Sequence, residues 1–274
     1  MQIKRIAGAL GAEISGVDLT QPLTPALAQD IRQVFLSAGV IFLRHQALSS
    51  EQFMAFARAM GEPVEYPFVK GFEDFPHIIE VKKLAHEKVN FGGIWHSDTT
   101  YLEQPPMGSM LLAKEIPPYG GDTLFACQYA AYEALSDTMQ RLLEGLQGIS
   151  TSAKADVSKT REDRIQSDGN HAAQKSYRSL HPVVRTHPET GRKALYVNVA
   201  HTAGIEGLTE AESAPLLEFL FQHQIKPEFT CRWTWEPHAL AFWDNRCTQH
   251  NPINDYHGFQ RILHRITLQG DKPV

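Results

Sequence analysis

Apolar positions in the first sixty residues follow two spacings, one typical of helices and one typical of buried strands. A helix is predicted over 22–36, because apolar residues recur every three or four positions behind a Thr-Pro cap. The continuous apolar run 40–43 predicts a buried strand, and a short strand is expected over 14–19. A second helix is predicted from 49 to 60, with Gly61 as its stop.

The rest of the chain is dominated by short runs that favour strands. These are predicted over 78–81, 108–113, 122–126, 183–186, 194–197, 228–235, 239–243 and 261–268. Helices are expected only at 129–135, 136–146 and 209–222. Many short strands with few helices indicate a mainly β protein with helical additions (α+β), built on a β-sandwich or jelly roll.

One stretch has a different character. Residues 152–179 are rich in charged residues, serine, glycine and asparagine, and carry almost no periodic apolar signal. A long segment of this kind in a compact domain is usually functional or disordered. We therefore interpret it either as a lid over a site or as a mobile surface insertion. No linker or repeat divides the chain, so residues 1–274 are interpreted as a single domain.

Composition narrows the classes of function. A hydrophobic content of 42% and a charged content of 21% are those of an ordinary soluble globular protein. A net charge of −5 gives no reason to expect nucleic acid or a membrane surface as a partner. No apolar run is long enough to span a bilayer, and the first residues lack the apolar core of a signal peptide. The three cysteines are far apart and form no CxxC pair, which argues against a disulfide framework and against a zinc–thiolate site. We expect a cytoplasmic protein.

Two histidines and one carboxylate are candidate metal ligands. His96 and Asp98 are two positions apart, and His250 follows far downstream. If the first two lie on or at the end of a strand, their spacing places both side chains on one face. Non-haem iron(II) oxygenases hold their metal with two histidines and one carboxylate and leave the other positions open. The same set also suits catalytic zinc.

The predicted strand 261–268 carries two arginines on one face. Arg261, Leu263 and Arg265 alternate along it, so both guanidiniums are expected to point inward. Buried arginines are rare unless they are paired with an anion. That anion is either the carboxylate of a bound small acid, held bidentately, or an acidic side chain in a structural salt bridge.

Four segments give the chain a family resemblance. They are Trp95-His96-Ser97-Asp98, Gly120-Gly121-Asp122-Thr123, Trp243-Asp244-Asn245-Arg246 with Gln249-His250, and Arg261-Ile262-Leu263-His264-Arg265. Together they resemble the taurine dioxygenase/2,4-D dioxygenase (TauD/TfdA) family of Fe(II)- and 2-oxoglutarate-dependent oxygenases, and the likeness runs from Gly11 to Pro273. The resemblance implies a double-stranded β-helix, or jelly roll, with iron at one mouth.

The resemblance also implies roles for individual residues in the use of iron, 2-oxoglutarate and O2. The iron ligands would be His96, Asp98 and His250. Thr123 and Arg261 would bind a carboxylate of the cosubstrate, and Trp243 would stand near the metal as a wall or belong to the ordinary core. The products would be succinate, carbon dioxide and an oxidised substrate. Because related halogenases carry a small residue in place of the carboxylate, Asp98 favours hydroxylation over halogenation.

The residues indicate the substrate less specifically than they indicate the metal and the cosubstrate. Arg265 matches the position that binds the acidic group of the substrate in the taurine enzymes of the family. Tyr66 and Gly92 stand near positions where those enzymes carry His and Asn, and His201 stands where Phe is typical. These differences count against taurine, while Arg265 favours a small anionic substrate such as a sulfonate, sulfate ester, phenoxyacid or other carboxylate. Thr99 is a further pocket candidate.

Two alternatives remain at this point. A zinc-type metallohydrolase would use the same ligands but would need no cosubstrate anchor, so Thr123 and Arg261 weigh against it. A non-catalytic jelly-roll binding protein would keep the site as a relic. Family members commonly form dimers or tetramers, so we expect a homo-oligomer.

Overall fold

The computed structural model describes residues 1–67, 69–90, 92–154 and 177–274. Most of the polar stretch 152–179 lies outside the described residues, so its interpretation as a lid stays a prediction. The strands are β1 (Gln2–Arg5), β2 (Ala12–Ser15), β3 (Val40–Leu43), β4 (Pro63–Val64), β5 (Ile78–Lys83), β6 (Gly108–Glu115), β7 (Thr123–Cys127), β8 (Gln147–Thr151), β9 (Arg178–Pro182), β10 (Val184–Thr186), β11 (Lys193–Leu195), β12 (Thr202–Ile205), β13 (Thr230–Trp233), β14 (Leu240–Asp244), β15 (Thr248–Pro252) and β16 (Arg261–Leu268). The helices are α1 (Pro25–Ala38), α2 (Ser50–Met60), α3 (Gln128–Glu133), α4 (Asp137–Leu143) and α6 (Glu210–His223), with short 3-10 turns η1 (Ser152–Lys154) and η3 (Pro227–Phe229).

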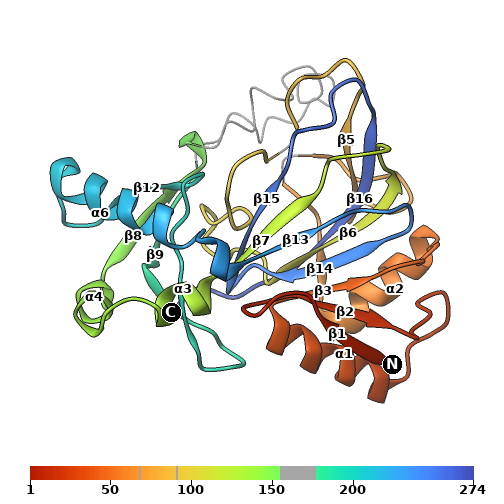
Figure 1. Ribbon diagram of the computed structural model, residues 1–274, viewed down its shortest axis with the longest axis horizontal. Coiled ribbons are helices and arrows are strands. Elements are labelled where there is room, and N and C mark those ends of the chain that lie inside the picture. Colours follow the sequence, from red (N-terminus) through yellow and green to blue (C-terminus); the bar gives the residue numbers. More distant parts are fainter. Residues whose placement is uncertain (68, 91, 155–176) are drawn as a thin grey trace.

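An eight-stranded sheet forms the larger layer of the protein (Figure 1). Its strand order is β1-β2-β3-β14-β6-β16-β4, and β5 pairs with β16 as well. All of its pairings are antiparallel except that of β2 with β3. In the register of β5 with β16, Lys83 lies opposite Arg261 and Ile79 lies opposite Arg265. Because residues directly opposite each other share a face, these four side chains point to the same side of the sheet.

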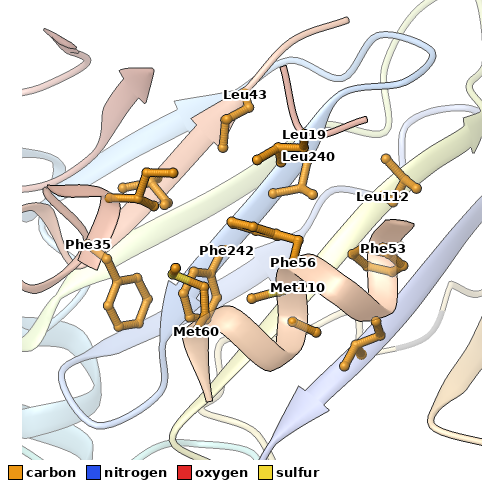
Figure 2. Packing of buried hydrophobic residues seen from close by; sticks show 14 of the residues in the cluster. Leu19, Phe35, Leu43, Phe53, Phe56, Met60, Met110, Leu112, Leu240 and Phe242 are labelled. Carbon is orange, nitrogen blue, oxygen red and sulfur yellow. The ribbon is translucent and has the colours of Figure 1, made fainter. Parts of the chain in front are cut away.

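Helices α1 and α2 cover one face of this sheet. Helix α2 turns Phe53, Phe56 and Met60 toward the strands, as Figure 2 shows. Phe35 of α1 stacks on Phe242 of β14 with the ring centroids 4.0 Å apart. The buried side chains on these two helices follow the spacing that predicted them, so burial of one apolar stripe holds each helix on the sheet.

A second, three-stranded sheet of order β13-β7-β15 lies against the other face of the larger sheet. Apolar side chains fill the space between the two layers. Phe42 of the larger sheet stacks on Trp233 of the smaller one with centroids 4.1 Å apart. The rings of Trp243 and Phe125 also meet across the layers, tilted and with centroids 5.8 Å apart. The two sheets do not share a hydrogen-bonded edge among the described residues, so the layers form an open sandwich of the predicted jelly-roll type.

A smaller lobe adjoins this sandwich. It contains the sheet β12-β8-β9 and the hairpin β10-β11, packed with α3, α4 and α6 around a separate apolar cluster. The two strands of the hairpin overlap the predicted strands 183–186 and 194–197 and pair with each other antiparallel. No helix in the described part of the chain is long and apolar enough to cross a membrane. The three cysteines are buried free thiols, as expected.

The observed strands differ from the prediction at several places. The run 40–43 and the run 261–268 are strands with the predicted bounds. The prediction of a strand over 14–19 is wrong in its bounds, because the pairing with β1 stops at Ser15 and Gly16 turns the chain with a φ of 70°. Strands β1, β4, β8, β9, β12 and β15 are absent from the prediction. Strand β15 matters most, because it contains His250.

Candidate metal centre

His96, Asp98 and His250 lie together between the two sheets. His96 and Asp98 come from the segment between β5 and β6, and His250 comes from β15. One oxygen of Asp98 is 3.7 Å from Nε2 of His96 and 3.8 Å from Nε2 of His250. All three residues are buried, and their candidate ligand atoms lie within 4.8 Å of one another. Atoms that bind one ion at about 2.0–2.2 Å must approach each other in this way.

Backbone hydrogen bonds hold the two histidines side by side. The N–H of His96 donates to the carbonyl of His250 at 3.1 Å, and the N–H of His250 donates to the carbonyl of His96 at 2.8 Å. Their ring centroids are 4.1 Å apart. Asp98 lies in the turn that follows, and its side chain still reaches the same point as that of His96. The segment that carries two candidate ligands is therefore attached to the strand that carries the third.

The tautomer of His96 is determined by its surroundings. Its Nδ1 lies 2.7 Å from the carbonyl oxygen of Ile94, which can only accept a hydrogen bond. Nδ1 therefore carries the hydrogen, and the lone pair of Nε2 faces Asp98. Gly92, with a φ of 70°, packs directly on the ring, because a Cβ added there would lie 2.9 Å from Cε1 of His96. On the other side of the centre, the Trp243 ring is 4.7 Å from the His250 ring and forms a wall beside it.

Asp98 is held by a buried polar network. Its Oδ2 accepts a hydrogen bond from the Ser109 hydroxyl at 2.8 Å and lies 3.0 Å from Nη2 of Arg265. Its backbone N–H donates to Oδ1 of Asn245 at 3.3 Å, and the same oxygen accepts from Nε1 of Trp243 at 2.9 Å. Oδ1 of Asp98 is left facing the two imidazoles, so the network aims one carboxylate oxygen at the space between them.

The charge states of the centre suit a cation. Burial lowers the pKa of His96 and lowers that of His250 further, so both imidazoles are neutral at neutral pH. Burial by itself would raise the pKa of Asp98, but the Arg265 guanidinium, the two imidazoles and the Ser109 hydroxyl hold it well below its ordinary value. Neutral imidazole and ionised carboxylate are the forms that bind a metal, so the centre is already in the protonation state that a divalent cation requires.

Arg261 of β16 and Thr123 of β7 are suited to bind an anion. Arg261 is buried, and its Nε and Nη2 have no hydrogen-bond partner among the described residues. Burial lowers the pKa of this guanidinium, but the ordinary value is so high that the group stays charged. The hydroxyl of Thr123 accepts a hydrogen bond from Nε1 of Trp235 at 3.0 Å, which leaves its own hydrogen to donate elsewhere. A buried charge with unmade hydrogen bonds is costly, so an anion bound here would relieve that cost.

Residues predicted for the substrate pocket lie around the candidate metal ligands. The Arg265 guanidinium lies 5.0 Å from the centre of the Tyr66 ring, and its Nε is buried without a hydrogen-bond partner in the described part of the chain. The His201 ring is 6.1 Å from that of His96, and burial lowers the pKa of His201 to about 3. Thr99, with a φ of 42°, has its hydroxyl buried with no hydrogen-bond partner in the described structure.

Sequence reasoning missed three residues of this centre. Ser109 and Asn245 hold Asp98, and the ring of Tyr101 lies 5.0 Å from that of His201. Tyr101 follows Asp98 by three positions, so its proximity to the metal segment was readable in the sequence. Ser109 was predicted only as part of a strand, and its contact with Asp98 depends on the tertiary fold.

A second group of potential ligands is an ion-pair network. His187, Asp244 and Cys247 lie close enough to hold a metal by distance alone. Nδ1 of His187 accepts hydrogen bonds from two backbone N–H groups, so Nε2 carries the hydrogen and donates to Asp244 at 3.0 Å. Arg246 contacts both oxygens of the same carboxylate at 2.8 and 2.7 Å. The donors of this cluster are thus already used, and it supports the turn between β14 and β15.

Comparison with known proteins finds similarity to dioxygenases. Residues 2–267 match the model of the family described as taurine catabolism dioxygenase TauD, TfdA. An alpha-ketoglutarate-dependent sulfate ester dioxygenase of Pseudomonas putida is 33% identical over 281 residues, covering 100% of this chain and 91% of the relative. The alpha-ketoglutarate-dependent 2,4-dichlorophenoxyacetate dioxygenase of Cupriavidus pinatubonensis is 32% identical, covering 96% of each.

Two solved structures extend the comparison. A taurine dioxygenase from Burkholderia xenovorans superposes with a TM-score of 0.86 at 37% identity, covering 100% of this chain and 90% of that one. The structure of AAD-2 in complex with Mn(II) and N-oxalylglycine gives a TM-score of 0.79 at 29% identity, covering 99% and 98%.

A jelly roll with two imidazoles and one carboxylate between its sheets defines the class of non-haem iron oxygenases. The chain belongs to the TauD/TfdA family, as its full-length matches show. It is an Fe(II)- and 2-oxoglutarate-dependent dioxygenase. The comparisons support neither a metallohydrolase nor a non-catalytic binding protein.

Proposed function

We propose that this dioxygenase hydroxylates a small anionic organic molecule at an iron held by His96, Asp98 and His250. The observation that carries the proposal is one buried cation site together with two buried arginines on the same face of β16. Asp98 and the histidines converge on one point, Arg265 lies beside them, and Arg261 has unmade hydrogen bonds. Two neutral nitrogens and one carboxylate oxygen fit ferrous ion and leave positions for exogenous ligands.

Arg261 and Thr123 would hold the distal carboxylate of 2-oxoglutarate. The Nε and Nη2 of Arg261, which have no partner among the described residues, and the hydroxyl hydrogen of Thr123 supply the donors. Each charge-assisted hydrogen bond contributes about 1.5–3 kcal/mol. When bound, iron and cosubstrate supply the oxidising chemistry that converts a C–H bond to C–OH with release of succinate and carbon dioxide. The protein residues bind and orient the two acids, and Trp243 closes the wall beside His250.

Arg265 would pair with the acidic group of the substrate. One edge of its guanidinium contacts Asp98 and Ser109, while its buried Nε has no partner among the described residues. Tyr66, His201 and Thr99 would line the pocket around it, and Gly92 would serve by leaving room for the His96 ring. The similarity to sulfate ester and phenoxyacid dioxygenases supports sulfate esters, sulfonates and carboxylates as candidate substrates.

Hydroxylation of a carbon that is bonded to a heteroatom would lead to cleavage of the substrate. If the oxidised carbon carries the sulfonate, the sulfate oxygen or an ether oxygen, its hydroxylated product is unstable. The hydroxyl loses its proton and becomes the C=O of an aldehyde, while the C–S or C–O bond breaks and sulfite, sulfate or an alcohol leaves with the bonding electrons. The net reaction then resembles cleavage of a C–S or C–O bond. A homo-oligomer of two or four copies, a cytoplasmic location and the lack of a nucleic-acid or membrane partner stay predictions of the sequence.

A substrate panel tests the proposal. Succinate release is measured with Fe(II), 2-oxoglutarate and O2 over sulfonates, sulfate esters, phenoxyacids, other carboxylates and neutral analogues of the same size. We expect anionic compounds to stimulate succinate release and the neutral analogues to leave it at the uncoupled rate. Equal stimulation by neutral compounds would contradict the role of Arg265.

A further inference from the structure

Lys83 is a buried cation that has no hydrogen-bond or ion-pair partner in the part of the chain that the structure describes. It is the last residue of β5, and only 3% of its surface is exposed. Its ammonium nitrogen has no hydrogen-bond partner among the described residues. Lysine is almost never fully buried unless its charge is paired, because removing an ammonium from water is very unfavourable. Because no described residue pairs with its charge, we interpret buried Lys83 as part of a site for a bound anion.

The position of Lys83 identifies where that anion binds. Lys83 lies directly opposite Arg261 in the register of β5 with β16, so both side chains project from the same face of the sheet. Both cations also lie against one aromatic ring. Nζ of Lys83 is 4.5 Å from the centre of the Tyr256 ring, and Cζ of Arg261 is 5.9 Å from it. The two charges therefore share one buried corner.

The acidic side chains whose charges act on Arg261 or Tyr256 are engaged elsewhere. Asp255 accepts a hydrogen bond from the backbone N–H of Gly121 at 2.7 Å. Asp122 accepts hydrogen bonds from Arg232 at 2.6 Å and from Thr234 at 3.1 Å. Glu87 accepts from the backbone N–H of Leu84. Within the described residues, neither Lys83 nor Arg261 has a carboxylate within the 4.0 Å of an ion pair. The Tyr256 ring attracts both cations, but a ring face does not supply the hydrogen-bond acceptors that their N–H groups lack.

We propose that Lys83 is a second cationic ligand of the distal carboxylate of 2-oxoglutarate, next to Arg261. This inference rests on the proposed function, in which that carboxylate enters the corner formed by Arg261 and Thr123. A carboxylate has two oxygens and about four acceptor sites, so it can satisfy Lys83 together with Arg261 and Thr123. Lys83 thereby makes the enzyme select a 2-oxo acid with a second carboxylate over one that ends in a methyl group.

The test compares two cosubstrates and two neighbouring lysines. Lys83→Met removes the charge and keeps the apolar length of the side chain. Lys82→Met is the matched control, because Lys82 is the adjacent residue, projects from the opposite face of the strand and is partly exposed near Glu80. The affinities of the Fe(II)-loaded proteins for 2-oxoglutarate and for 2-oxovalerate, which carries a methyl in place of the distal carboxylate, are measured without oxygen. Melting temperatures of the metal-free proteins are measured in parallel.

We expect Lys83→Met to weaken 2-oxoglutarate binding about 10- to 100-fold, as loss of one charge-assisted hydrogen bond does, and to change 2-oxovalerate binding less than about 2-fold. The metal-free Lys83→Met protein should melt at a higher temperature than the wild type, because an uncompensated buried charge is gone. Lys82→Met should change neither affinity. Lys83→Gln, which keeps a donor without the charge, should give an intermediate loss and serves as the second variant if Lys83→Met does not fold.

Unchanged 2-oxoglutarate affinity in both Lys83 variants would overturn the proposal, and so would an equal loss for both cosubstrates. Arg261→Ala separates this failure from a failure of the proposed function. If Arg261→Ala weakens 2-oxoglutarate binding while the Lys83 variants do not, only the role of Lys83 is wrong. If Arg261→Ala has no effect either, the cosubstrate site itself lies elsewhere.

Discussion

The guanidinium of Arg265 lies 3.0 Å from the carboxylate of Asp98, and both groups contact the hydroxyl of Ser109. The residue that the sequence assigns to the substrate therefore also supports a candidate metal ligand. Of the two alternatives that the sequence left open for this arginine, the structural ion pair is present. The unpartnered Nε leaves room for the second alternative on the same guanidinium.

Replacement of Arg265 tests this double role. In Arg265→Ala, the buried Asp98 carboxylate loses its pairing charge, so the free energy of unfolding of the metal-free protein should fall by about 3–5 kcal/mol. The KM for anionic substrates should rise at the same time. Denaturant unfolding and steady-state kinetics measure the two effects, with Arg265→Lys as the variant that keeps the charge. A raised KM with unchanged stability would show that Arg265 serves the substrate alone.

Gly92 is expected to be required for metal binding because it packs against the ring of His96. A methyl group at this position would lie 2.9 Å from Cε1 of the imidazole, so Gly92→Ala must displace the ring or the loop. We expect metal affinity to fall about 10- to 100-fold, as it does when the support of a ligand is disturbed. Gly207→Ala is the control, since Gly207 has a similar φ of 78° and open space around it. Similar metal affinities in the two variants, measured by titration with Mn(II) or Fe(II), would refute the role of the contact.

Stability of the metal-free protein should decrease in acid. Burial, followed by the nearby Lys114 charge, lowers the pKa of His264 to about 4, whereas an unfolded histidine titrates near 6.5. Between these values the unfolded chain binds more protons than the folded one, so the stability contributed by neutral His264 is present above pH 6.5 and is lost as the pH falls toward 4. The full linkage slope is about 1.4 kcal/mol per pH unit, and the partial exposure of His264 makes its share smaller.

Replacement of His264 measures its contribution to the pH dependence of the unfolding free energy. His264→Leu should flatten the dependence of unfolding free energy on pH between 6.5 and 4, while leaving the value near pH 8 much less changed. Denaturant unfolding at several pH values provides the measurement. An unaltered slope in the variant would mean that other groups carry the acid sensitivity.

Regular alternation made much of this protein predictable. The strand period of two is invariant, so Arg261 and Arg265 could be placed on one inward face from their spacing alone. The apolar run 40–43 identified a central strand for a different reason, because a strand that is buried on both faces is apolar at every position. By contrast, Thr248, Gln249 and His250 form a buried strand of polar residues, which carries no apolar pattern to read. Strands that build a polar site are the ones that such patterns miss.

The sequence also could not show which residues lie next to each other on neighbouring strands. Lys83 lies beside Arg261 because β5 pairs with β16 in one particular register, and nothing local specifies that register. One signal did exist, since Ile79, Val81 and Lys83 continue the alternation of β5 by one more step. Ending the predicted strand at residue 81 excluded the lysine. The contact of Asp98 with Ser109 and Arg265 likewise needs three separate segments to meet.

An anaerobic titration tests whether the protein binds Fe(II) and 2-oxoglutarate together at one site. The wild-type protein, loaded with Fe(II) in the absence of oxygen, is titrated with 2-oxoglutarate while its visible absorption spectrum is recorded, and Arg261→Ala is titrated in parallel. We predict a visible charge-transfer band that saturates with 2-oxoglutarate in the wild type. In Arg261→Ala, iron binding should be retained, and the same band should appear only at a far higher concentration of 2-oxoglutarate. Absence of the band in the wild type, or an equal loss of iron and cosubstrate binding in Arg261→Ala, would contradict it.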